Sequence, residues 1–206
     1  MTVLQESGWA MDTDVAWIRE RLSVGFRWHE PERAHDPVRT DDAWWDELRP
    51  LVRDLGISLG VPPGPANDLL DGLRRRFLDP ALWHLYPDVL PCLETLDARA
   101  WRMDIASNNI PELESMLLRL GLRRRFNRVH CSAWMGYEKP HPEFFRLATA
   151  GLAPGSRIWM VGDNAEADVS GARRQGLRAV LVRKPAPGVE PYLDDLTRLP
   201  ELLERA

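Results

Sequence analysis

The feature that most constrains the fold is an alternation of short apolar runs with helical segments, which begins near Tyr86. The runs of strand length are residues 101–106, 129–132, 157–161 and 179–182. Helix-forming segments separate them, at residues 87–96, 109–121, 142–150 and 166–175. Strands that alternate with helices are typical of a parallel, doubly wound sheet. We therefore predict an α/β core over residues 86–206.

The first part of the chain has a helical period instead. Its candidate helix boundaries are a cap at Asp12, starts at Asp41 or Asp42 and at Pro65, and an end at Gly56. The helix capped by Asp12 would carry on one face Val15, Ile18, Leu22 and Phe26. The polar, proline-containing stretch 30–40 is expected to be a loop. This pattern predicts a small helical domain over residues 1–85.

The composition of the 206 residues is that of an ordinary globular protein, with 44% hydrophobic and 28% charged residues. No stretch has the roughly 18 uncharged apolar residues of a membrane-spanning helix, and residues 1–11 lack the features of a signal peptide. Cys92 and Cys131 are too few for a disulfide framework, so we expect a cytoplasmic protein. The net charge of −4 gives no electrostatic reason to expect nucleic acid or a membrane as a partner.

Several conspicuous residues have ordinary structural explanations. The 9 tryptophans are scattered, which favours packing in the core or at an interface. The arginine runs 74–76 and 123–125 are expected to be solvated helix faces, because the net charge is acidic. His130 and Cys131 are adjacent on a predicted strand, so they point to opposite faces and are expected to pack. His141 is expected to belong to loop structure.

Polar side chains follow three of the predicted strands. Ser107 and Asn108 follow the first, Lys139 lies in the loop after the second, and Asp163 and Asp168 follow the third. Parallel sheets of this kind place their chemistry at the carboxyl ends of the strands. A hydroxyl can donate to a phosphoryl oxygen, an ammonium can neutralise its charge, and a carboxylate can hold Mg²⁺. The set therefore predicts a site for a phosphate beside a divalent metal.

Lys139 is the most informative member of this set. Arginine occupies nearly all the basic positions, and the lysines are Lys139 and Lys184. Lys139 lies in a loop directly before Pro140, and its compact ammonium there indicates that this position requires a lysine rather than an arginine. Each feature alone has a common alternative, since a Ser-Asn pair after a strand is often a helix cap and an aspartate there is often a turn residue. The prediction of a phosphate site depends on finding all three features together, in this order along the chain.

These residues carry a resemblance to the haloacid dehalogenase (HAD) superfamily of hydrolases. Residues 105–108, with Ser107 and Asn108, resemble its second motif, and residues 139–145 resemble its third. Residues 161–164, followed by Asp168, resemble its fourth. The sequence Tyr86-Pro87-Asp88-Val89 resembles the return from a helical cap into the core. The resemblance implies a Rossmann-like doubly wound core with a small helical cap, the arrangement of the family's helical cap subclass.

The resemblance also implies a mechanism. An aspartate after the first core strand attacks phosphorus, and a second aspartate two positions later protonates the leaving group. By motif match Ser107 would bind the phosphoryl group, Lys139 would orient and neutralise it, and Asn108 would contact phosphate or substrate. Asp163 would ligate Mg²⁺, and Asp168 would ligate the metal or support its shell. The implied activity is a Mg²⁺-dependent phosphatase that acts on a small phosphorylated metabolite.

The sequence departs from the family at the first motif. The early Asp-x-Asp is Asp12-Thr13-Asp14, and the residues before it do not form a buried strand pattern. Asp12 is better explained as a helix cap. The first core strand and both catalytic aspartates are thus expected to lie upstream of Met1, and the chain as given is expected to be truncated and inactive. Without that strand, the strands ending at Ser107 and Asp163 would have unpaired edges.

Two alternatives stay open. A 2-haloacid dehalogenase attacks carbon and needs no metal, and Asp163 argues against it because that position would have no metal to bind. A non-catalytic phosphate-binding or regulatory domain is the other alternative, and the absent nucleophile motivates it. The substrate and the oligomeric state cannot be read from these residues.

Overall fold

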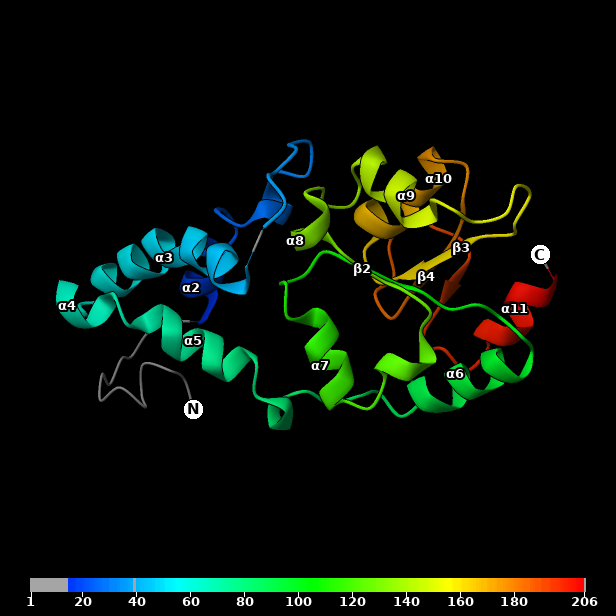
Figure 1. The fold of residues 1–206 in the computed structure, drawn as a ribbon, viewed down its shortest axis with the longest axis horizontal. Coiled ribbons are helices and arrows are strands. Elements are labelled where there is room, and N and C mark those ends of the chain that lie inside the picture. Colours follow the sequence, from blue (N-terminus) through cyan, green and yellow to red (C-terminus); the bar gives the residue numbers. More distant parts are fainter. Residues whose placement is uncertain (1–14, 39, 206) are drawn as a thin grey trace.

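In the computed structural model, residues 15–38 and 40–205 are described, and they form two lobes side by side (Figure 1). We call residues 15–85, apart from residue 39, the helical lobe, and residues 86–205 the α/β lobe. The predicted cap at Asp12 lies outside the described residues. Figure 1 shows the helical lobe as an arm that extends from one side of the α/β lobe.

The helical lobe consists of short helices around α3. Its elements are α2 (Val15–Arg21), η1 (Arg27–His29), α3 (Asp41–Ser58), α4 (Pro63–Ala66), α5 (Leu69–Phe77) and η2 (Pro80–Leu82). The Thr40 hydroxyl caps α3, because its Oγ1 accepts a hydrogen bond from the Ala43 amide at 3.2 Å. Trp44 and Trp45 on α3 are buried, as is Leu70 on α5. These side chains explain how a lobe of short helices keeps an apolar interior.

Three boundaries predicted for this lobe are wrong. The helix predicted to end at Gly56 continues to Ser58, and the glycine that follows its end is Gly60, with a φ of +84°. Gly56 instead lies so close to Leu69 that a side chain there would collide with it. The first helix ends at Arg21, so it does not reach Phe26. The helix predicted to start at Pro65 is divided into α4 and α5.

The α/β lobe alternates strands with helices, as the sequence predicts. Its helices are α6 (Val89–Ala98), α7 (Leu113–Arg119), η3 (Arg123–Arg125), α8 (Ser132–Met135), α9 (Pro142–Thr149), a π-helix η4 (Ala165–Ser170), α10 (Gly171–Arg174) and α11 (Leu199–Arg205). Its strands are β1 (Ile105–Ser107), β2 (Val129–Cys131), β3 (Trp159–Gly162), β4 (Arg178–Val182) and β5 (Tyr192–Leu193). The predicted α/β class with parallel strands is confirmed.

The strands pair in two parallel sheets. β1 pairs with β2, with Ser107 opposite Cys131, and β4 lies between β3 and β5, with Gly162 opposite Leu181. No ladder joins β1 to β3 among the described residues. The division lies between β1, which ends at Ser107, and β3, which ends at Gly162, and these are the two strand edges that the sequence predicts to be unpaired without the first core strand.

Helices cover both faces of the sheet around β4. On one face, α6 and α11 pack with Val180 and Val182, and on the other α9 and α10 pack with Ala179 and Leu181. This alternation is the period of 2 that a strand buried on both faces must have. Among the helices of residues 15–38 and 40–205, none is both long and apolar enough to cross a membrane.

The segment after β3 differs from the predicted α-helix. Residues 165–170 form a π-helix, and α10 follows it. Asn164 caps the π-helix, because its Oδ1 accepts hydrogen bonds from the Glu166 and Ala167 amides at 3.0 and 2.9 Å. Single π-turns of this kind occur frequently at functional sites. The wider turn brings Asp168 back toward the end of β3.

Candidate functional site

Lys139 lies between the two sheets and joins their ends. Its Nζ donates hydrogen bonds to the Ala106 carbonyl of β1 at 2.8 Å and to Oδ1 of Asp168 at 2.6 Å. The side chains of Lys139 and Asp168 are only 8% and 6% exposed. A charge buried to this extent needs a paired partner, which Asp168 supplies. The ammonium thus has a fixed position at the carboxyl ends of β1 and β3.

Asn108 fixes the backbone of Lys139. Its Nδ2 donates to the Lys139 carbonyl at 2.9 Å, and its Oδ1 accepts from the Lys139 amide at 2.7 Å. The carboxamide therefore holds the lysine loop against the end of β1 at both backbone groups. This is a positioning role, and the predicted contact of Asn108 with phosphate or substrate stays a prediction.

Ser107 ends β1, beside this loop. Its Oγ is 3.3 Å from Nδ2 of Asn109, which can donate to it. The Asn109 amide donates in turn to Oγ of Ser132 at 3.1 Å, at the start of α8. The Ser107 hydroxyl is half-buried and its hydrogen is free to donate elsewhere. His141 serves the same loop by capping α9, since its Nδ1 accepts from the Glu143 amide at 3.1 Å.

The two predicted carboxylates have different surroundings. Asp168 is fully engaged, because Oδ1 pairs with Lys139 and Oδ2 accepts from the Asn164 amide at 3.0 Å. Its carboxylate lies over Gly162, where a side chain would occupy the same space. Asp163 is 47% exposed, and its Oδ2 lies 2.5 Å from Nζ of the exposed Lys184. The hydrogen bond that Lys184 donates to Asp163 raises the pKa of Lys184 above its ordinary value.

Asp163 fits the requirements of a magnesium ligand better than Asp168. Mg²⁺ is commonly bound by one or two carboxylates together with phosphate oxygens and water. The Asp163 carboxylate is accessible and its partner Lys184 lies in solvent, so the pair can open. In the part of the chain that the structure describes, no group of three or more His, Cys, Asp or Glu side chains could hold a metal. Among the described residues at this sheet edge, Asp163 is the accessible carboxylate and Asp168 the buried one.

Sequence reasoning missed Lys184 and Glu138. The scarcity of lysine that drew attention to Lys139 applies equally to Lys184, which also precedes a proline. Glu138 is 1% exposed, and its Oε2 has no hydrogen-bond partner among the described residues. Burial raises the pKa of Glu138 to about 7, against the opposing effect of a hydrogen bond from Ser132 and the charges of Arg27 and Lys139. No sequence pattern predicts that Glu138 is a buried carboxyl group.

Cys131 is a buried side chain of β2, and His130 beside it is partly buried. Burial raises the pKa of the Cys131 thiol to about 12, so the thiol is protonated at neutral pH. Burial also lowers the pKa of His130, with Arg128 acting in the same direction. A protonated, buried thiol is a poor nucleophile, which agrees with the packing role expected for these residues.

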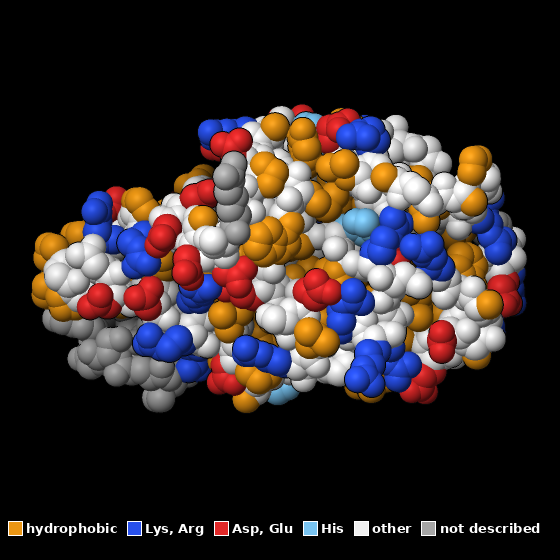
Figure 2. Space-filling view, in the orientation of Figure 1, with side chains coloured by type: hydrophobic (Ala, Val, Ile, Leu, Met, Phe, Trp, Pro, Cys, Tyr) orange, Lys and Arg blue, Asp and Glu red, His pale blue; other side chains and the backbone are white. Residues whose placement is uncertain are grey.

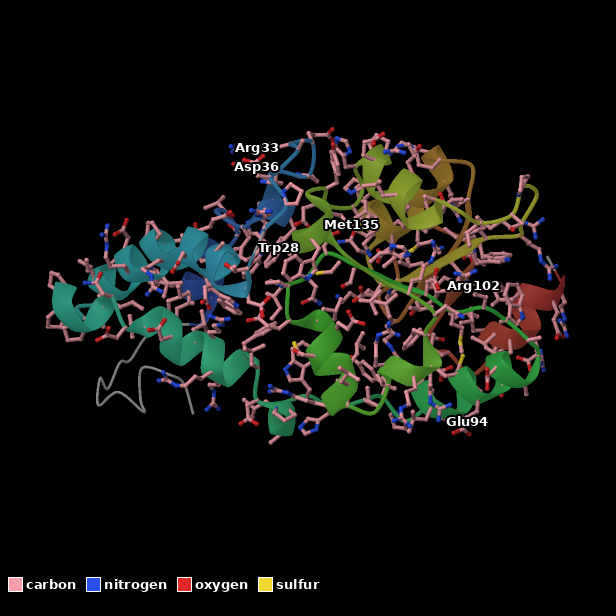
Figure 3. The ribbon with its side chains drawn as sticks, viewed as in Figure 1. Trp28, Arg33, Asp36, Glu94, Arg102 and Met135 are labelled. Atoms are coloured by element: carbon pink, nitrogen blue, oxygen red, sulfur yellow. The ribbon has the colours of Figure 1, made fainter. Side chains whose placement is uncertain are left out.

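The site lies on the side of the α/β lobe that faces the helical lobe. The chain that leaves β2 enters α8 on that side (Figure 1). The amides of His35 and Val38 donate to the carbonyls of Gly136 and Ala133 at 2.8 and 3.1 Å, so the helical lobe runs along α8. Apolar side chains gather where the lobes meet in Figure 2, and Figure 3 shows Trp28 at the inner end of the helical lobe.

Comparison with known proteins identifies related sequences. The family described as haloacid dehalogenase-like hydrolase matches residues 41–176. Phosphoserine phosphatase from Thermus thermophilus is 32% identical over 169 residues, which are 79% of this chain and 65% of that protein. Glyceraldehyde 3-phosphate phosphatase from Methanopyrus kandleri is 32% identical over 173 residues, which are 76% of this chain and 73% of that protein.

The match covers only 61% of a third relative, haloacid dehalogenase-like hydrolase domain-containing protein 3 from Bos taurus. Solved structures share the fold. A HAD hydrolase from Bacillus subtilis bound to magnesium is 17% identical with a TM-score of 0.73, over 98% of this chain and 87% of that chain. A 2-haloacid dehalogenase from Pseudomonas syringae is 24% identical with a TM-score of 0.64, over 98% of this chain and 86% of that chain.

Proposed function

Because the chain belongs to the haloacid dehalogenase-like hydrolase family, we propose that it provides the phosphate site of a Mg²⁺-dependent phosphatase for small phosphorylated metabolites. The observation that carries this proposal is the position of Lys139, held by Ala106 and Asp168 where β1 and β3 end. Two relatives that carry the names of phosphatases support it. Both relatives act on small phosphorylated compounds according to those names.

The chain's own residues would bind and orient a phosphoryl group. An ammonium has three N–H donors, and two of those of Lys139 are used within the protein. The third can donate to a phosphoryl oxygen, whose negative charge the ammonium also neutralises. Ser107 would donate its hydroxyl hydrogen to a second oxygen. Asn108 and Asp168 would keep the ammonium in place while this happens.

Asp163 would hold the metal, and Asp168 would support the site through Lys139. Bound Mg²⁺ supplies neutralising charge at the phosphoryl oxygens. Lys184 must then give up its contact with Asp163, which is feasible because both side chains reach solvent. In the ion-free protein Lys184 keeps the exposed carboxylate compensated.

The nucleophile would be carried by a strand that fills the division between β1 and β3. Such a strand would pair with both open edges and end beside Lys139. A carboxylate at that end could attack phosphorus to form an aspartyl-phosphate as the P–O bond to the leaving group breaks, with a second, protonated carboxyl group giving its proton to the leaving oxygen. That second group would then take a proton from the water that hydrolyses the aspartyl-phosphate and releases inorganic phosphate. The described residues do not include this strand, so we propose that they are inactive by themselves.

The helical lobe would be the family's cap and would select the substrate, with the division between cap and core at residues 85 and 86. A non-catalytic phosphate-binding domain is the second candidate, and the division of the sheet favours it. A 2-haloacid dehalogenase has a structural likeness in its favour. The accessible Asp163 opposes it, since dehalogenation gives this carboxylate no metal to hold.

The test is a hydrolysis assay with p-nitrophenyl phosphate and a panel of small phosphate esters. The chain would be assayed alone and after fusion to an apolar strand that ends in Asp-x-Asp. We expect turnover only from the fusion, abolished by EDTA and restored by Mg²⁺. Lys139→Met and Asp163→Asn should each lower kcat at least a hundredfold in the fusion.

Other outcomes separate the alternatives. EDTA-insensitive release of halide from a 2-haloacid would assign the dehalogenase activity instead. Saturable phosphate binding by the fusion without any turnover would support the binding domain and contradict the phosphatase.

A further inference from the structure

A buried carboxylate at the start of α7 is bonded entirely to the other lobe. Oε1 and Oε2 of Glu112 accept hydrogen bonds from Nε1 of Trp45 at 2.9 and 3.2 Å. Oε1 also accepts from Nε and Nη2 of Arg74 at 3.0 and 2.8 Å. Trp45 belongs to α3 and Arg74 to α5. We call Glu112, Trp45 and Arg74 the interlobe cluster.

Glu112 and Trp45 of the interlobe cluster are buried, and Arg74 is 26% exposed. Glu112 is 7% exposed. Its partner Trp45 belongs to a buried apolar cluster that takes side chains from both lobes, among them Trp44, Leu70, Leu113, Met116 and Leu117. Removing a carboxylate from water is costly unless its partners supply good geometry, and here one indole and one guanidinium do so. The sequence predicts a solvated helix face at Arg74, and this holds in part: the side chain is 26% exposed, but it also pairs with the buried Glu112.

Only a short and well-held segment of chain joins Glu112 to the phosphate site. Residues 107–112 lead directly from the end of β1 to this carboxylate. The segment is held on its way, because the Asn109 amide donates to Oγ of Ser132 at 3.1 Å and Nε1 of Trp134 donates to the Pro111 carbonyl at 2.9 Å. A movement of Glu112 relative to the helical lobe is therefore a movement of that lobe relative to Ser107.

We propose that Glu112 is a positioning residue that sets where the helical lobe sits over the phosphate site. Through Trp45 and Arg74 it fixes the wall that faces the leaving group of a bound phosphate ester. The geometric part of this inference depends only on the contacts of the interlobe cluster. Its catalytic part rests on the proposed function, since it concerns how well the substrate is held.

Because Arg74 has a second partner, Glu112 and Arg74 can separate without leaving a buried charge unpaired. Nη1 of Arg74 lies 2.5 Å from Oδ1 of Asp42, which belongs to the same lobe and is largely exposed. If the lobes separate, Arg74 keeps this partner and Glu112 enters water. An interface with two such compensated states can switch between them.

The decisive variant is Glu112→Gln, which keeps the size of the side chain and removes its charge. Glu114→Gln is the matched control, because Glu114 lies on the same helix but pairs with Arg123 within the α/β lobe. Asp42→Asn is a second control, which removes only the exposed partner of Arg74. Protease cleavage between residues 78 and 88 and the radius of gyration from X-ray scattering report on the lobes without requiring turnover.

We expect Glu112→Gln to accelerate this cleavage about tenfold and to increase the radius of gyration, while both controls match the parent. In the active fusion, KM should rise at least fivefold with kcat lowered less. Trp45→Phe, which removes the N–H and keeps an aromatic ring, should shift cleavage and KM in the same direction if Glu112→Gln does not fold.

Cleavage and scattering equal to those of Glu114→Gln would overturn the geometric part. Altered cleavage with unchanged KM in an active fusion would overturn the catalytic part. A fusion without any turnover would contradict the phosphatase proposal, and the cleavage rates would still decide whether Glu112 holds the two lobes together.

Discussion

Lys139 shows how a single residue can depend on neighbours from three parts of the chain. Its ammonium is almost out of water, and the Ala106 carbonyl and the Asp168 carboxylate replace its hydration. Removing one partner of a buried pair leaves an uncompensated charge, which costs about 3–5 kcal/mol. The position of Asp168 is therefore as important to the site as Lys139 itself.

Gly162→Ala should disrupt this pair. The added methyl group would overlap the Asp168 carboxylate, so Asp168 must move away from Lys139. We expect the free energy of unfolding to fall by about 3 kcal/mol, measured by urea denaturation. Gly64→Ala is the control, because nothing lies within 4 Å of a side-chain carbon at that position. Equal stability of the two variants would contradict the proposed role of Asp168.

Glu138 should make stability depend on pH. The unfolded chain releases this proton near pH 4.5, and the folded protein keeps it to about pH 7, because burial raises the pKa of Glu138. Between these values the folded state binds more protons, so stability from this group is complete below pH 4.5 and is lost as pH rises through 7. The full change is about 3 kcal/mol.

Glu138→Gln should remove this dependence. Its stability should exceed that of the parent at pH 8 and match it near pH 4.5, measured by urea denaturation at each pH. Glu143→Gln is the control, because Glu143 is not buried and a hydrogen bond from Arg146 lowers its pKa. If the difference in stability between the parent and Glu138→Gln stays constant from pH 4.5 to 8, the pKa of Glu138 is the same in the folded and unfolded protein, which would contradict this prediction.

At the scale of elements, Asn108 joins the end of β1 to the lysine loop. Asn108→Asp keeps an acceptor for the Lys139 amide but turns the donor toward the Lys139 carbonyl into an acceptor. We expect a loss of about 1–3 kcal/mol in stability and faster hydrogen exchange at the Lys139 amide. Asn67→Asp, on the exposed turn after α4, should change neither quantity. Unchanged exchange at Lys139 would mean that the loop holds its shape without Asn108.

Elements whose cause is local were predictable from the sequence. The strands β2, β3 and β4 lie at predicted apolar runs, whereas β1 covers only the end of the run 101–106, from Ile105 to Ser107. The helix end predicted at Gly56 was wrong because Gly56 packs against Leu69, thirteen positions later, while Gly60 has the positive φ that follows the helix end. The α-helix predicted over residues 166–175 was wrong for a similar reason. The π-helix there is capped by Asn164, and Gly171 after it packs against Pro140 and Phe145 from another part of the chain.

In the candidate site, too, some residues were predictable from the sequence and others were not. Ser107, Lys139 and Asp163 follow strands and could be named from the sequence. Their partners could not, because Lys184 reaches Asp163 from another loop. Glu112 likewise meets residues 38 and 67 positions away. A side chain's position follows from its own strand or helix, whereas its partner depends on how the elements pack.

At the scale of the whole molecule, the most important feature is the division of the strands into two sheets. Ile105 is bonded to the β2 side through Arg128, so the backbone of the next residue, Ala106, faces the division. Its carbonyl accepts from Lys139, and its N–H has no strand to pair with among the described residues. Unpaired strand edges of this kind are open to pairing with further strands.

Filling the division should stabilise the protein and protect that amide. Each new backbone hydrogen bond contributes about 0.5–1.5 kcal/mol, so a strand that pairs on both sides adds several kcal/mol. In the Asp-x-Asp fusion we expect a higher midpoint of urea denaturation and at least hundredfold slower hydrogen exchange at Ala106. A fusion with a proline in the middle of the added strand is the control, because proline cannot donate to a ladder. Slow exchange at Ala106 in the chain without the fusion would mean that the edge of β1 is already covered, and the added strand would then have no place in the sheet.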